Sequence, residues 1–68
     1  MLKQIMVNAA RKHAEAEIEL HKANIEVYMQ QVVGIGEHSD IIETIQKELD
    51  KMATANDRLE MLNKHFGA

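Results

Sequence analysis

The residues best spaced for metal chemistry are His13, Glu17 and His21, which follow one another at intervals of four. The sequence has four histidines and no cysteine, and imidazole with carboxylate suits zinc or iron. On a helix, however, the outer two residues lie about 12 Å apart, too far for one ion to touch all three. We therefore expect no resident metal or cofactor, and we interpret His13 and His21 as polar residues beside an interface.

A second candidate for chemistry is the adjacent pair Glu37 and His38, which falls in a predicted turn. A catalytic pair needs a pocket, a nucleophile or activated water, and a group that stabilises the developing charge. No Ser-His-Asp or Cys-His pattern accompanies this pair, and a helical hairpin supplies no evident pocket. The stretch Gly34-Ile35-Gly36 lacks the third glycine and the lysine of a phosphate-binding loop. The sequence therefore predicts a protein that is not an enzyme.

Two long segments rich in strong helix formers must position these side chains. The chain has no proline and three glycines. We predict an all-α fold in a single domain, residues 1–68, with a helix over about 2–33, a turn over about 34–38 and a helix over about 39–66. Because the turn is short, the helices should pack as an antiparallel two-helix hairpin. The residues expected to form the turn or to cap the second helix are Gly34, Gly36, Glu37, His38, Ser39 and Asp40.

The first predicted helix carries two apolar stripes on nearly opposite sides, since residues advance about 100° each. One stripe should pack on the second helix, and it consists of Val7, Ala14, Ile18, Ile25, Tyr28 and Val32. The second helix offers one seam for it, made of Ile45, Met52, Leu59 and Phe66 beside Ile42, Leu49, Asn56 and Asn63. Asn56 and Asn63 either lie buried, where they fix the register at a cost in stability, or lie at a wet edge.

The other stripe of the first helix has no partner in the chain. Its members are Leu2, Met6, Ala9, His13, Ala16, Leu20, Ala23 and Val27. Small side chains every seven residues let another backbone come close, so we predict that this stripe is the interface of a homodimer, a four-helix bundle. The alternative is that the alanines simply raise helix propensity on a partly exposed face.

Composition narrows the classes of partner and compartment. A chain of 68 residues buries too little surface to be comfortably stable alone, and without cysteine no disulfide stabilises it. The net charge of −3 disfavours a general nucleic-acid footprint. No apolar run approaches the length of a membrane span or the core of a signal peptide. We expect a cytoplasmic protein without membrane association.

Local basic charge near the N-terminus supports an alternative function. Lys3, Arg11 and Lys12 precede a run of glutamates, and a symmetric dimer would bring two such clusters together. Small RNA-binding dimers of the Rop type have the same hairpin architecture. The alternative to a protein-interaction module is therefore a small nucleic-acid-binding regulator with Rop-like architecture, although no motif of that family is present.

The turn and the second helix also carry a resemblance. The stretch Val33-Gly34-Ile35-Gly36-Glu37-His38, with its continuation through residues 39–43 and 59–66, resembles short uncharacterised proteins of marine T4-like tailed phages. About half of the chain is covered. The resemblance implies a phage or environmental origin, and hence the cytoplasm of a host cell, but it implies no activity. Together these observations predict a non-enzymatic, oligomeric helical module that binds another protein.

Overall fold

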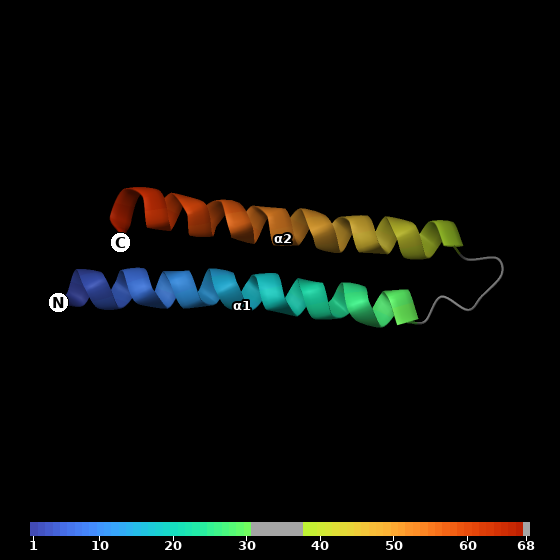
Figure 1. The fold of residues 1–68 in the computed structure, drawn as a ribbon, viewed down its shortest axis with the longest axis horizontal. Helices are drawn as coiled ribbons and strands as arrows, with labels where there is room; N and C mark the ends of the chain where they lie inside the picture. Colours follow the sequence, from blue (N-terminus) through green and yellow to red (C-terminus); the bar gives the residue numbers. More distant parts are fainter. Residues whose placement is uncertain (31–37, 68) are drawn as a thin grey trace.

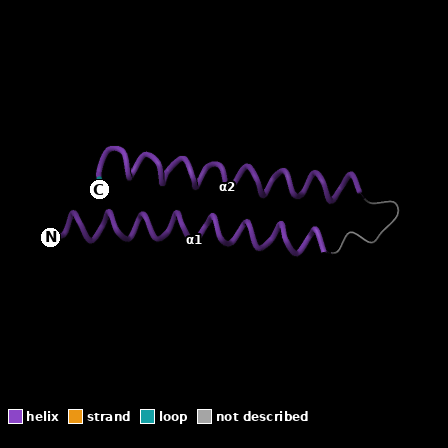
Figure 2. Tube along the Cα trace, viewed as in Figure 1, coloured by secondary structure: helices purple, strands orange, loops and turns teal. Residues whose placement is uncertain are grey.

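In the computed structural model, two helices of equal length lie side by side and run in opposite directions (Figure 1). Helix α1 spans Leu2–Gln30 and helix α2 spans His38–Phe66. The structure describes residues 1–30 and 38–67, and within them helix is the sole regular secondary structure (Figure 2). The Cα trace measures 54 × 15 × 13 Å. The predicted all-α hairpin is confirmed.

The helix boundaries differ slightly from those predicted. Helix α2 begins at His38, so Ser39 and Asp40 belong to its first turn rather than to a preceding cap. Polar and acidic residues are favourable both at a cap and in the first turn, which is why sequence alone misplaces such a start by a residue or two. Several residues of the prediction lie outside the described ones, namely Val32, Val33, Gly34, Gly36 and Glu37.

The face that α1 turns towards α2 is the predicted one. Ala14 and Ile25 are buried, with 2% and 7% of their surface exposed. Val7, Ile18 and Tyr28 are half-buried. The spacing of three and four residues between these positions keeps them on one side of the helix, so a single stripe follows α2 along most of its length.

The face that α2 turns towards α1 is rotated from the predicted seam. Ile45, Met52 and Leu59 are half-buried as expected, but the flanking row is a different one. The residues that complete the contact face are Ile41, Glu48, Ala55 and Leu62. The residues that the prediction placed in the seam but that are exposed are Ile42, Leu49, Asn56, Asn63 and Phe66. The prediction favoured large apolar residues, whereas the structure places a small residue and a paired charge between the helices.

Very little apolar volume is enclosed between the helices. In the part of the chain whose burial is described, the buried hydrophobic residues are Ala14, Ile25 and Ala55. Two of these three are alanines, so the helix backbones approach closely there. A core of this size supplies little hydrophobic stabilisation, because that term scales with the apolar area removed from water.

Enlarging a buried alanine should therefore destabilise the hairpin. We expect Ala55→Leu to lower the free energy of unfolding by about 1–3 kcal/mol, since the added methyl groups must push the helices apart. Ala53→Leu is the matched control, because Ala53 is exposed on the same helix and should change stability by less than about 0.5 kcal/mol. Urea denaturation at one protein concentration measures both. Equal losses in the two variants would contradict the close approach at Ala55.

Candidate functional site

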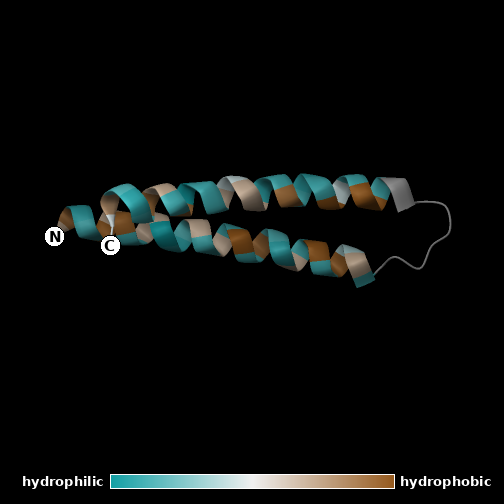
Figure 3. Cartoon of the chain, turned by 45° about the horizontal axis from the view of Figure 1, so that its top comes forward, coloured by the Kyte–Doolittle hydropathy of each residue, from teal (hydrophilic) through white to brown (hydrophobic). Residues whose placement is uncertain are grey.

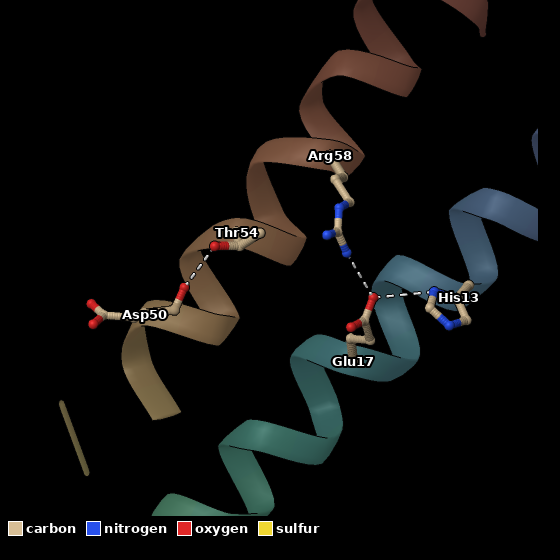
Figure 4. A network of polar contacts seen from close by, with 5 residues as sticks. All are labelled: His13, Glu17, Asp50, Thr54 and Arg58. Carbon is tan, nitrogen blue, oxygen red and sulfur yellow. Dashed lines mark hydrogen bonds and ion pairs between the residues drawn. The ribbon is translucent and has the colours of Figure 1, made fainter. Parts of the chain in front are cut away.

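A polar network joins the middle of the two helices on one side of the hairpin (Figure 4). Oε1 of Glu17 on α1 accepts a hydrogen bond from Nη1 of Arg58 on α2 at 3.3 Å. The same oxygen lies 3.1 Å from Nδ1 of His13, one turn earlier on α1. The His13 and Arg58 side chains are largely exposed. Solvent screening makes such contacts weak, so they orient the helices more than they stabilise them.

A second polar cluster lies in the contact between the helices. Glu48 of α2 is the buried charged residue in the part of the chain whose burial is described. Its Oε2 lies 2.5 Å from Nδ1 of His21 and accepts a weaker hydrogen bond from Nδ2 of Asn24 at 3.4 Å. The side chains of His21 and Glu48 are 13% and 11% exposed. Both partners come from α1, so this carboxylate ties the helices together at one register.

The hydrogen bond from His21 lowers the pKa of Glu48 below its ordinary value of 4.5, and Asn24 and the positive charge of Lys51 act in the same direction. Burial opposes them by disfavouring the charged form. A carboxyl whose pKa is lower in the folded state than in the unfolded state binds its proton less readily when folded. Its stabilising contribution is therefore present above pH 4.5 and is lost as the pH falls through the folded pKa.

Acid should accordingly destabilise the hairpin through Glu48. We expect the thermal midpoint of the wild type to fall as the pH drops below about 4.5. Glu48→Gln should lower the midpoint at about pH 7 and weaken its dependence on pH in the acid range, as followed by circular dichroism. Glu60→Gln, which changes an exposed glutamate of the same helix, should retain the wild-type acid dependence. An unchanged acid dependence in Glu48→Gln would refute this role.

The three residues considered for metal binding are not brought together. His13 and Glu17 contact each other, but His21 turns towards Glu48 on the other helix. Within the residues that the structure describes, no three ligating side chains converge. The arrangement pairs each of these two histidines with one carboxylate, which satisfies hydrogen bonds instead of forming a coordination shell.

Arg11 links the open end of the hairpin, where both chain termini lie (Figure 1). Its Nε donates to Oδ1 of Asn63 on α2 at 3.0 Å, and its Nη1 donates to Oδ1 of Asn8 at 2.8 Å. Its Nη2 lies beside Gly67. A Cβ atom added to Gly67 would lie 2.5 Å from this nitrogen, so the position suits glycine. The positive guanidinium thus sits at the negative end of the α2 dipole. Asn63 is an exposed edge residue, which decides between the two alternatives that the sequence left open for it. Asn56 is exposed as well.

Two shallow grooves run along the side of the hairpin that carries Arg58. The polar groove encloses about 260 Å³ and is lined by Glu17, His21, Asp50, Lys51, Thr54 and Arg58. The apolar groove encloses about 410 Å³ and is lined by Ala10, His13, Ala14, Asp57, Arg58, Met61, Leu62 and Phe66. The Thr54 hydroxyl already donates to the carbonyl oxygen of Asp50 at 3.0 Å (Figure 4). This hydroxyl therefore donates to a backbone carbonyl and not to the side chain of Glu17 or His21, which line the same groove.

The longest row of exposed apolar side chains described above is the second apolar stripe of α1. All eight of its residues, from Leu2 to Val27, are exposed, and Leu20 and Val27 retain 55% and 50% of their surface. Hydrophobic segments recur along the whole of α1 in Figure 3. The stripe runs for roughly 38 Å along the helix. A row of exposed apolar side chains of this length, interrupted by His13, is unusual on a monomer and is typical of an interaction surface.

Helix α2 also exposes apolar side chains, a feature that the sequence interpretation missed. Ile42 and Leu49 directly follow the contact-face residues Ile41 and Glu48, and they are about half exposed. The prediction had assigned them to the seam, because large aliphatic residues at heptad spacing normally mark a core. The heptad row that could have corrected the predicted seam is the one that contains Ala55. This residue lies seven positions after Glu48 and seven before Leu62. This second stripe is shorter than that of α1, because Asn56 and Asn63 continue its row.

Comparisons with known proteins assign the chain to no group: no protein-family model, curated protein or solved structure matches it. The resemblance to short phage proteins therefore stays a prediction. Neither α1 nor α2, the helices of the described residues, has the length and apolar character needed to cross a bilayer.

Proposed function

We propose that this protein is a non-enzymatic helical module that self-associates through α1 into a four-helix assembly and binds another protein with its remaining surface. The observation that carries the proposal is the contrast between the two faces of α1. The face towards α2 encloses two buried side chains, Ala14 and Ile25, whereas the opposite face exposes a longer apolar stripe.

The energetics of a small chain support self-association. A 68-residue hairpin whose core consists largely of alanine gains little from burying its own apolar surface. Covering the exposed α1 stripe with a second copy would give α1 a second packed face, and the gain would scale with the apolar area covered. A second copy is always present at the same concentration, and closed two-fold dimers are the commonest oligomers.

The nucleic-acid alternative is less well supported. Of the basic residues near the N-terminus, Arg11 is already engaged with Asn8 and Asn63, which leaves Lys3 and Lys12 as exposed cations of that cluster. Two lysines per chain on a protein of net charge −3 make a weak electrostatic footprint.

Sedimentation equilibrium tests the proposed interface. The wild type should sediment at twice its chain mass of 7.7 kDa, and Leu20→Glu should raise the dimer dissociation constant by about 100-fold or more, because it places a charge in an apolar contact. Leu49→Glu is the matched control. Leu49 is 49% exposed against 55% for Leu20, but it lies on α2, and its variant should remain dimeric.

The control also defines the outcomes that would refute the proposal. A wild-type protein that sediments as a stable monomer at micromolar concentration would remove self-association altogether. A dimer that Leu49→Glu dissociates and Leu20→Glu leaves intact would move the interface to α2. Helix content measured by circular dichroism shows whether either variant has lost its fold.

A further inference from the structure

We infer that the second copy docks on α1 in the antiparallel direction, about a two-fold axis that crosses α1 between Ala14 and Glu15. In this orientation the larger side chains of the α1 stripe face alanines of the second copy. The inference rests on the α1 interface proposed above and adds to it the direction, the register and the residue pairs of the contact.

The exposed stripe consists of two rows that each repeat every seven residues. One row holds Met6, His13, Leu20 and Val27, and the other holds Leu2, Ala9, Ala16 and Ala23. An antiparallel contact matches a member of one row with a member of the other row on the second helix. About the stated axis, the matched pairs are Met6 with Ala23, His13 with Ala16, Leu20 with Ala9, and Val27 with Leu2. In three of the four pairs, the larger side chain fills the space left by an alanine.

A parallel contact would pack the same residues less evenly. Each residue would then face its own copy, so Ala16 would face Ala16 and Leu20 would face Leu20. The distance between helix axes depends on the side chains in contact, within about 8–10 Å. Leucine pairs would hold the helices apart while alanine pairs left gaps, and gaps forfeit packing energy. The antiparallel direction also sets the helix dipoles in opposite senses, which is the favourable arrangement.

Charged residues beside the stripe favour the same direction. Lys12 and Glu19 are exposed, and neither forms an ion pair within the residues that the structure describes. About the stated axis, Lys12 lies level with Glu17 of the second copy, but Glu17 lies on the other flank of the stripe. In an antiparallel contact the same flanks of the two helices adjoin, so Lys12 comes beside Glu19, two residues further along that flank, and symmetry repeats the pair. A parallel contact would instead direct Lys12 towards Glu17, whose carboxylate already contacts His13 and Arg58.

Disulfide cross-linking distinguishes the two directions, since the chain has no cysteine of its own. Ala9→Cys and Leu20→Cys are prepared as separate full-length chains, one with an added tag, and are mixed and oxidised. The antiparallel contact brings the introduced thiol of the first variant to that of the second, so the mixed dimer should dominate. Identical cysteines would lie roughly 16 Å apart along the axis, too far for a disulfide. Met6→Cys mixed with Ala23→Cys is a second pair with the same expectation.

Each outcome separates this inference from the interface on which it rests. Cross-linking of each variant with itself, and not in the mixture, would establish a parallel contact and overturn the inference while leaving the α1 interface intact. A dimer by sedimentation that none of these cysteines cross-links would overturn both. Wild-type sedimentation as a monomer would do the same.

Charge reversal provides a test that leaves the apolar stripe intact. Lys12→Glu should weaken the dimer by about tenfold, because two attractive pairs become repulsive. Adding Glu19→Lys to the same chain should restore the wild-type dissociation constant, whereas adding Glu17→Lys should not. If Glu17→Lys restores the dissociation constant of the Lys12→Glu chain and Glu19→Lys does not, the contact is parallel and the inference is overturned.

Discussion

The contact between the two helices buries two alanines, Ala14 and Ala55, and the small size of these side chains constrains the rest of the hairpin. Ala14 and Ala55 occupy buried positions that larger residues would fill in a wider interface. The helices can therefore lie near each other, but they enclose almost no apolar volume. Most of the larger aliphatic residues of the contact face, such as Ile18 and Leu59, are only half-buried. Others, such as Leu20 and Ile42, are exposed on the outer faces, where a monomer gains little from them. The shape of the core is thus the reason that so much apolar surface is available for another chain.

A polar cluster takes the place of part of the missing apolar core. Glu48 would be costly to bury alone, and His21 and Asn24 supply its hydrogen bonds from the facing helix. Such a cluster adds little net stability compared with a packed leucine, yet it discriminates between registers. A slip of one turn would leave the carboxylate without partners, and the cost of an unpaired buried charge is far larger than that of an imperfect apolar contact.

The sequence predicted the fold class and the inner face of α1 because both depend on simple periodicity. Val7, Ala14, Ile18 and Ile25 repeat at helical spacing, and no glycine or proline interrupts them. The sequence-based prediction of the rotation of α2 was wrong because two decisive contact residues are an alanine and a glutamate. A ranking by hydrophobicity does not assign either residue to the contact face. Ala55 fits between the helices because it is small, and Glu48 can be buried because His21 on the facing helix pairs with it. Neither reason is visible until both helices are placed.

Arg11 has a consequence for how the hairpin opens. Fraying of two antiparallel helices ordinarily starts at the free ends, because the covalent connection holds only the other end together. Here the guanidinium bridges Asn8 of α1 and Asn63 of α2 close to those free ends. Beyond the terminal turns, this bridge couples the unwinding of α1 to that of α2. Local opening and global unfolding should thus converge into one cooperative event, in a chain whose small core would otherwise favour gradual melting from one end.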